Sequence, residues 1–168
     1  MATRNPNVLV EFYTGEVQIL SGLSKHMVDY LCRHGILTVS RSQMRGYGKR
    51  RRFNFTDILL ARSIRELLQA GVSVLSMRTA LVELGRQLHS DSPAVLRDKR
   101  IVIRGGVPYL SQPDEPPTDL LARGQMAFSF VLEIEDLWQK AEPLHEQREA
   151  ARRSRIERAM NARKERIS

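Results

Sequence analysis

The strongest constraint on the fold is the placement of glycine and serine near the start of the chain. Thr14 can cap a short helix that runs to Leu20, where the helical pattern is interrupted. Gly22 then suits a tight turn, and Ser24 is a good N-cap for a second helix that ends at Gly35. Two short helices joined by a small glycine-containing turn are typical of a helix-turn-helix.

The second helix has one apolar and one polar face. At about 100° per residue, Met27, Val28 and Leu31 fall together on the side expected to face the core. The other sides carry Lys25, His26, Asp29, Tyr30 and Arg33. A helix that offers Lys, His, Tyr and Arg in this way suits entry into the major groove of DNA. A solvated helix face is the alternative, and the helix alone does not decide between the two.

A strongly basic segment follows, with the sequence Gly46-Tyr47-Gly48-Lys49-Arg50-Arg51-Arg52-Phe53-Asn54-Phe55. A glycine turn precedes four consecutive cations, and the alternating Phe53 and Phe55 would point to one side of a strand. We therefore expect a hairpin, or wing, that is anchored by its phenylalanines and offers its cations to DNA phosphates. Such contacts give a steep salt dependence and little base selectivity. A solvated basic loop is the alternative.

The rest of the N-terminal half predicts a short strand at Val8–Tyr13 and two further helices. The third helix opens at Thr56-Asp57 and ends at Ala70-Gly71, and the fourth is capped by Ser73 and stops near Leu88. Their apolar stripes are Leu60, Ile64, Leu67 and Leu68 in the third helix, and Val74, Met77, Leu81 and Val82 in the fourth. Both stripes are most simply explained as core.

The next segment predicts a small antiparallel sheet. Residues 100–104 and 107–110, separated by Gly105-Gly106, predict a β-hairpin with a primed turn, in which Pro108 favours an edge strand. A third strand is expected over residues 125–132, with Met126, Phe128, Phe130 and Leu132 on one face. So thin a sheet needs another surface to cover it, either the fourth helix or a second subunit. A dimer interface is favoured over a small-ligand pocket.

The C-terminal segment is helix-prone from Glu133 onward. Leu137, Trp138 and Ala141 can dock its first turns, and Pro143 is expected to end or kink the helix. Residues 144–168 are rich in Ala, Arg and Glu and bury little. This tail either binds DNA phosphates nonspecifically or is a solubilising, disordered end.

Turn residues and charge divide the chain into three parts. We expect a winged helix-turn-helix domain over residues 1–90, a small β-containing module over 93–142, and a basic helical or disordered tail over 143–168. The first and last parts are basic and the middle part is acidic. The predicted fold class is therefore α+β and mostly helical.

Composition narrows the classes of partner. The 168 residues include 27 Lys and Arg against 19 Asp and Glu, for a net charge of +8, which predicts nucleic acid or an acidic membrane surface as partner. The single cysteine, Cys32, excludes a disulfide framework or a cysteine-rich metal site within one chain. No apolar run approaches the ~20 residues that span a bilayer, and Met1–Pro6 lacks the apolar stretch of a signal peptide. We expect a cytoplasmic, nucleoid-associated protein with no membrane partner.

Motifs for catalysis are not found in the sequence. The four histidines show no metal-ligand spacing, and there is neither a phosphate-binding glycine loop nor a nucleophile elbow. We therefore expect no catalytic residues, no metal and no cofactor, and a protein that is not an enzyme.

Over residues ~12–85, about half of the chain, the order of these elements resembles the N-terminal domain of the MerR (mercury-resistance regulator) family of bacterial transcription regulators. The matching stretches are Gly22-Leu23-Ser24, Val28–Leu31, Gly35-Ile36-Leu37, Arg41, the basic wing, Phe55-Thr56-Asp57 and Leu67–Ser73. The resemblance implies a winged helix-turn-helix that binds a pseudo-palindromic operator as a homodimer.

The resemblance places Ser24, Lys25, His26 and Tyr30 at the DNA on the recognition helix, and Tyr47 and Lys49–Arg52 at the phosphate backbone through the wing. With Arg33 from the same helix and Arg41 as a further phosphate contact, the expected DNA-binding residues are Ser24, Lys25, His26, Tyr30, Arg33, Arg41, Tyr47, Lys49, Arg50, Arg51 and Arg52.

Two features depart from the family. Asp29 stands where the family usually has a phosphate-contacting arginine, so it is expected to pair with Arg33 or to accept from a cytosine amino group. The long coiled-coil helix and sensor that follow this domain in well-known members are replaced by the break at Asp91-Ser92-Pro93, and Cys32 lies inside the DNA-binding part. A cysteine-based metal sensor is therefore not carried over.

We expect a homodimeric, sequence-specific DNA-binding transcriptional regulator, with double-stranded DNA as its main partner and RNA polymerase or another protein as a further candidate. The alternatives are an architectural or recombination accessory protein of a mobile element, and an antitoxin-like repressor with a protein partner.

Overall fold

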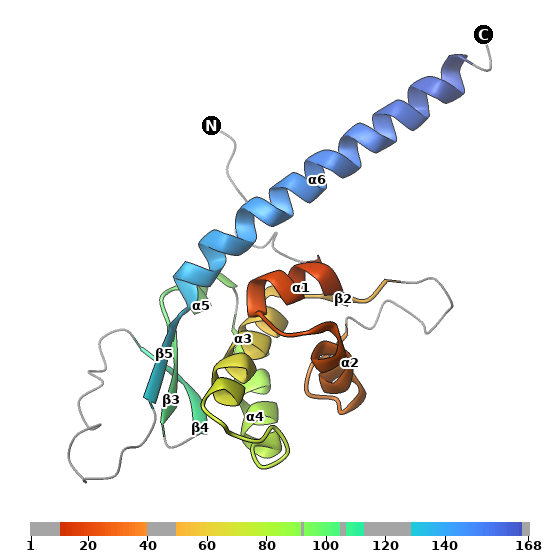
Figure 1. Cartoon of the computed structure of the whole chain (residues 1–168). Coiled ribbons are helices and arrows are strands. Elements are labelled where there is room, and N and C mark those ends of the chain that lie inside the picture. The colour runs from red at the N-terminus through yellow and green to blue at the C-terminus, as the bar shows by residue number, and fades with distance from the viewer. Residues whose placement is uncertain (1–10, 40–49, 92, 105–106, 113–128, 166–168) are drawn as a thin grey trace.

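The computed structural model describes residues 11–39, 50–91, 93–104, 107–112 and 129–165 (Figure 1). In chain order the elements are β1 (Phe12–Tyr13), α1 (Thr14–Ser21), α2 (Lys25–Arg33), β2 (Arg52–Phe53), α3 (Phe55–Gln69), α4 (Arg78–Ser90), α5 (Pro93–Arg97), β3 (Arg100–Arg104), β4 (Val107–Ser111), β5 (Ser129–Glu133) and α6 (Ile134–Glu165). The fold is α+β and mostly helical, as predicted.

The two helices α1 and α2 form around the predicted turn. Gly22 takes the left-handed conformation with φ 76° at the end of α1. The Ser24 hydroxyl accepts a hydrogen bond from the Met27 amide at 3.2 Å and so caps α2, which ends just before Gly35 at φ 66°. Thr14, however, is the first helical residue and not the cap. The N-cap is Tyr13, and its backbone amide donates a hydrogen bond to the Glu16 carboxylate at 2.7 Å, which stabilises the N-terminus of α1.

The start of α3 differs from the prediction that Phe53 and Phe55 share one strand. Asn54 caps α3, since its side chain accepts from the Asp57 amide while the Asp57 carboxylate accepts from the Asn54 amide, both at 2.9 Å. Phe55 is therefore the first residue of a helix. Both phenylalanines are buried, as expected, but they reach the core from two different elements.

The fourth helix begins later than Ser73, at Arg78. Its buried residues are Leu81, Leu84 and Leu88, whereas Val82 is 48% exposed, contrary to the prediction. Val82 is exposed because the buried side of α4 is the one that carries Leu81 and Gly85. Val82 is turned about 100° from Leu81 and so lies off that side. A β-carbon at Gly85 would lie 3.2 Å from Leu60 of α3, so the two helices approach closely there.

The predicted hairpin is present as β3 and β4, and the strand order is β4-β3-β5 with antiparallel neighbours. Pro108 lies on the edge strand β4, as expected. β5 begins at Ser129; Met126, Phe128 and the predicted turn at Gly105-Gly106 lie outside the described residues. The sheet lies against α4 on its β4 side, so the fourth helix provides the covering surface.

The long helix α6 closes the core and then leaves the body of the molecule (Figure 1). Its buried residues Leu137, Trp138 and Ala141 dock as predicted, and the Trp138 ring meets Phe55 edge-on with 4.9 Å between ring centroids. The helix does not end at Pro143. A proline removes one backbone hydrogen bond, and contacts of the following turns with α1 hold the helix in place.

Buried residues from Phe12 to Ala141 form one hydrophobic cluster that includes α1 to α4, the sheet and the start of α6. The division into parts at residues 90–93 and 142–143 stays a prediction. Within the described part of the chain, no helix is both long and apolar enough to span a bilayer.

Candidate nucleic-acid interface

Five of the eleven predicted contact residues lie on α2 or at its N-cap. Lys25, His26 and Arg33 are exposed, while Val28 and Leu31 on the opposite side are completely buried. Ser24 is exposed but its hydroxyl is already engaged as the helix cap. The α2 helix is therefore anchored by its apolar side and leaves a polar side with three cationic or titratable groups free for a ligand.

Tyr30 lies at the edge of this side of α2. Its ring packs on His34 with 4.2 Å between centroids and an angle of 45° between the ring planes. The His34 backbone carbonyl accepts from Arg78 at 3.2 Å, so the first residue of α4 holds the end of α2. Sequence reasoning missed Arg78, because only the folded chain brings these helix ends together.

The Asp29 carboxylate is bonded to the Arg51 guanidinium, which joins α2 to the residue just before β2. The predicted pairing of this carboxylate with Arg33 is therefore wrong. The Nε of Arg33 donates to the Asp29 backbone carbonyl instead, at 3.4 Å. An ion pair with Arg51 neutralises the carboxylate that would otherwise repel a phosphate.

The basic stretch is less free than predicted. Arg52 is bonded to Glu11 at 2.7 Å, and both side chains are about one-third exposed. Arg51 is held by Asp29. Of the three described arginines of the stretch, Arg50 is exposed, and Arg51 and Arg52 are partly buried. The cause is that β1 pairs with β2 and brings Glu11 beside the wing. Arg41, Tyr47 and Lys49 lie outside the described residues.

Tyr13 links Arg50 to α6 through contacts that sequence reasoning missed. The guanidinium carbon of Arg50 lies 5.9 Å from the Tyr13 ring centroid, and that of Arg148 in α6 lies 5.1 Å from the same centroid. Both distances are within the range of cation–π attraction. The expected strand at Val8–Tyr13 was the available signal, because successive side chains of a strand point to opposite faces and Phe12 is buried.

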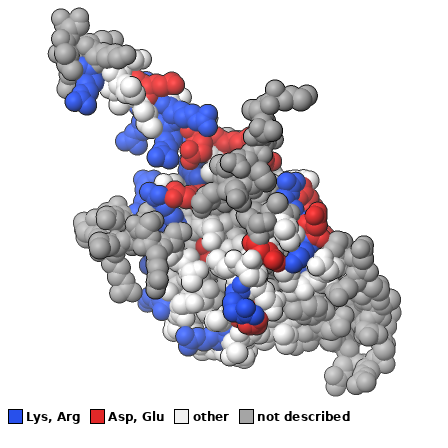
Figure 2. All heavy atoms as spheres, turned by 180° about the vertical axis from the view of Figure 1, so that it is seen from behind, with Lys and Arg blue, Asp and Glu red and all other residues white. Residues whose placement is uncertain are grey.

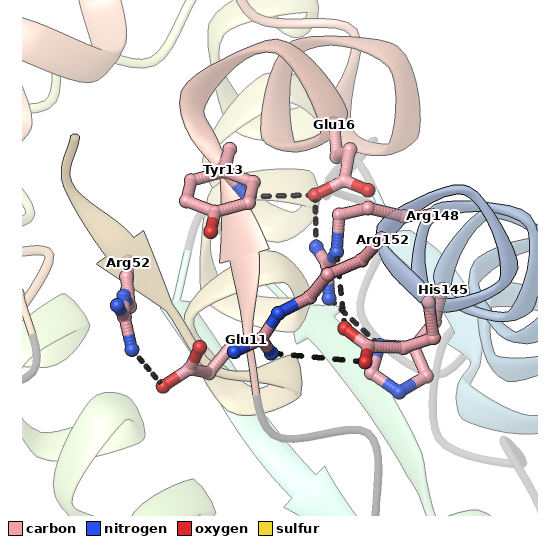
Figure 3. A network of polar contacts seen from close by, with 8 residues as sticks. Glu11, Tyr13, Glu16, Arg52, His145, Arg148 and Arg152 are labelled. Atoms are coloured by element: carbon pink, nitrogen blue, oxygen red, sulfur yellow. Dashed lines mark hydrogen bonds and ion pairs between the residues drawn. The ribbon is translucent and has the colours of Figure 1, made fainter. Parts of the chain in front are cut away.

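Arg148 is held in place by several polar contacts (Figure 3). It donates to the Glu16 carboxylate at 2.6 Å and to Nδ1 of His145 at 2.9 Å. The side chains of Arg148 and Glu16 are less than one-fifth exposed. Since Glu16 also accepts from the Tyr13 amide, one carboxylate connects α6 to the start of the helix-turn-helix.

A second polar cluster lies around the N-terminal end of α3. The buried Asp57 accepts from the Thr38 hydroxyl at 3.3 Å and lies 3.6 Å from Nε2 of His89 in α4. The Asp57 carboxylate raises the pKa of His89. This cluster connects the segment after α2 to α3 and α4.

Cys32 is half-buried on α2. Burial raises its pKa to about 11, so the thiol is protonated at neutral pH and is a poor nucleophile. Among the residues that the structure describes, no three His, Cys, Asp or Glu side chains are grouped so that they could hold a metal ion.

Comparison with known proteins gives distant relatives. No protein-family model matches the chain. The chain is 26% identical over 127 residues to a protein of Mycobacterium bovis named as an uncharacterized HTH-type transcriptional regulator, and to proteins of the same description in two strains of Mycobacterium tuberculosis. The alignment covers 76% of this chain and 55% of each relative, so the chain spans about half the length of the curated relatives it matches.

Proposed function

We propose that this chain is a sequence-specific DNA-binding transcriptional regulator of the MerR type that acts as a homodimer. The observation that carries the proposal is the arrangement of α2: a helix docked through Val28 and Leu31, preceded by a glycine turn, with Lys25, His26 and Arg33 exposed. The names of the mycobacterial relatives support the same class of function.

In this proposal α2 enters the major groove with its first turn leading. The N-terminus of a helix carries a partial positive charge and unpaired amide groups, both of which favour an approach to phosphates. Lys25 and His26 lie in that first turn, where recognition helices contact base edges. They are the residues that select the sequence.

The wing supplies affinity that does not depend on sequence. Arg50 is exposed beside Tyr13 and donates to a phosphate directly. Arg51 and Arg52 are positioned by Asp29 and Glu11. A guanidinium has five donors in a planar fork, so each of these two arginines can keep its carboxylate and still bind a phosphate oxygen.

The homodimer places two α2 helices on two half-sites. Recognition helices of such dimers lie about 34 Å apart along the duplex, one helical turn, and the two-fold symmetry of the dimer makes the operator pseudo-palindromic. The part of the sheet of β3, β4 and β5 that α4 leaves uncovered is the proposed contact between the subunits. The proposal assigns the chain no chemical reaction.

The test is selection of sheared host genomic DNA on the purified full chain at roughly 0.15 M salt, followed by sequencing. An inverted repeat near promoters is the expected result. Broad recovery without a motif would instead indicate an architectural or recombination accessory protein. Recovery of no DNA, with a stoichiometric protein partner that copurifies, would indicate an antitoxin-like repressor.

A further inference from the structure

The part of α6 beyond the body of the molecule, residues 150–163, is called the arm here. All its side chains are exposed, and it extends away from the other elements (Figure 1). Isolated helices of this length gain little stability from their own hydrogen bonds. The arm keeps its direction because α6 is anchored at its base, by Trp138 in the core and by Arg148 on Glu16.

Arginines recur on one side of the arm. Arg148, Arg152 and Arg155 follow each other at i, i+4 and i+7, which places them on the side of α6 that faces α1 at the base of the arm. At about 100° per residue, Arg163 falls on the same side two turns further on. Arg153 and Arg158 lie about 100° or more from the middle of this row, on its two opposite sides. Figure 2 shows Lys and Arg side chains gathered along the projecting helix and at its base.

The arginines of this side have little competition from acidic groups. Arg152 lies 3.8 Å from Glu149, at the outer limit of an ion pair, and is 69% exposed. Neither Arg155 nor Arg163 forms an ion pair with any carboxylate in the described part of the chain. An exposed row of unneutralised guanidinium groups is complementary to a row of phosphates.

The base of the arm is next to the wing. Tyr13 contacts both Arg50 and Arg148. The basic side of α6 therefore begins next to the exposed arginine of the wing, with only the Tyr13 ring between them. A duplex bound at Arg50 is therefore close to the first turn of the arm. From Arg148 to Arg163 the helix rises roughly 22 Å, which is the length of about six base pairs.

We propose that the side of the arm formed by Arg152, Arg155 and Arg163 binds the phosphates of the DNA duplex beyond the wing. The inference rests on the proposed function and extends its site to α6. Because the contacts are to phosphates, the arm adds affinity and salt dependence for every sequence and does not alter which bases are preferred.

A second copy of the chain fits the arm less well than DNA does. The large apolar side chains of the arm are Ile156 and Met160, which are 49% and 57% exposed. Two such residues one turn apart provide far less than the ~800 Å² per partner that a stable protein interface buries. The excess of arginine would also bring like charges together in a pair of identical arms.

The experiment compares two variants of the full chain that lose the same charge from the same helix. Arg152→Gln/Arg155→Gln removes two of the three proposed contacts, and Arg153→Gln/Arg158→Gln is the matched control. Glutamine and arginine have similar helix propensities, and circular dichroism checks that helix content is kept. Binding of a random-sequence 30-bp duplex is measured by fluorescence anisotropy over a series of KCl concentrations, and sedimentation gives the oligomeric state.

The expected result is a slope of log K against log [KCl] that is about 2 smaller in magnitude for the first variant, since each lost phosphate contact removes about 0.9. The control should keep the slope of the wild-type chain to within about 0.5. Equal slopes for the two variants, or a change of oligomeric state in the first variant only, would overturn the arm proposal while DNA binding itself stands. Failure of the wild-type chain to bind any duplex would overturn the proposed function and this inference with it.

Discussion

Asp29 in the middle of α2 and Arg51 just before β2 form an ion pair that joins the proposed recognition helix to the wing. The two side chains are about one-third to two-fifths exposed, so the pair is accessible from the surface on which DNA is proposed to bind. In the proposed complex with DNA, the Asp29 carboxylate would position Arg51 for the phosphate backbone and would not be an isolated negative charge near the phosphates.

Replacing Asp29 with Asn is expected to release Arg51 and to remove one negative charge from the interface. Binding of random-sequence DNA should tighten by up to about fivefold, in line with ~1 kcal/mol for a partly exposed pair, while discrimination between the selected site and random DNA falls. Anisotropy titrations with both duplexes measure the two effects. Asp98→Asn is the control, because Asp98 is exposed and lies outside α2 and the wing; identical behaviour of the two variants would contradict the role of Asp29.

Replacing Arg50 with Gln is expected to weaken binding to all sequences alike. The salt slope should fall by about 1 in magnitude, the amount for one phosphate contact, and the selected motif should stay the same. Arg86→Gln is the matched control, since Arg86 is exposed on α4 and pairs with Glu83. An unchanged slope for Arg50→Gln would mean that the wing does not contact the backbone.

Replacing Lys25 or His26 with Ala is expected to change the sequence preference. A good base contact provides about 1–3 kcal/mol of discrimination, so at least one position of the selected motif should become degenerate. Repeating the genomic selection with each variant measures this. If the motif survives both substitutions, α2 is not the helix that selects the sequence.

Replacing Trp138 with Ala is expected to cost about 3–5 kcal/mol of unfolding free energy, the usual loss for a buried aromatic residue. Trp138 is 5% exposed and packs edge-on against Phe55, so a cavity would open beneath the helix-turn-helix. Urea unfolding followed by circular dichroism gives the value. Ile156→Ala in the arm is the control and should stay within about 0.5 kcal/mol of the wild-type chain; equal losses would show that the base of α6 is not docked.

The contact between His89 and Asp57 predicts a dependence of stability on pH. The carboxylate raises the pKa of His89 above 6.5, its ordinary value in the unfolded chain. The stabilisation is therefore fully present below pH 6.5 and is lost as the pH rises through the raised pKa. The difference in Tm between the wild-type chain and His89→Gln should be larger at pH 5.5 than at pH 8.5, and a difference that does not vary with pH would contradict the ion pair.

Local signals predicted the helix-turn-helix well. The turn glycines and the helix cap near α2 depend only on neighbouring residues, so they can be predicted without the rest of the fold. These residues are Gly22, Ser24 and Gly35. The polar side of α2 follows from the period of the helix. The predicted limits of α3 and α4 were less accurate, because Asn54 precedes Thr56 and is the cap of α3, and residues 74–77 form turns before α4 begins.

The contacts that join the parts of the site depend on long-range pairing. Glu11 meets Arg52 only because β1 and β2 are neighbours, and Tyr13 meets Arg148 only because α6 packs back on α1. Long-range contacts also explain why α6 continues through Pro143. A proline inside a helix predicts a break, but Trp138 before it and Arg148 after it are both held by contacts with other elements. Sequence patterns therefore predicted the polar side of α2, but not the contacts that join Arg51 to α2 and α6 to β1 and α1.

The contact of Trp138 with Phe55 makes the core at the start of α3 depend on α6, which is synthesised after it. The helix-turn-helix leaves the ribosome first, but the aromatic ring at the start of α3 stays uncovered until residue 138 has been made and α6 has folded back. Contacts so distant along the chain form late in folding. The nascent N-terminal half therefore lacks its finished core, and a chain interrupted before α6 would expose an apolar surface to chaperones and proteases.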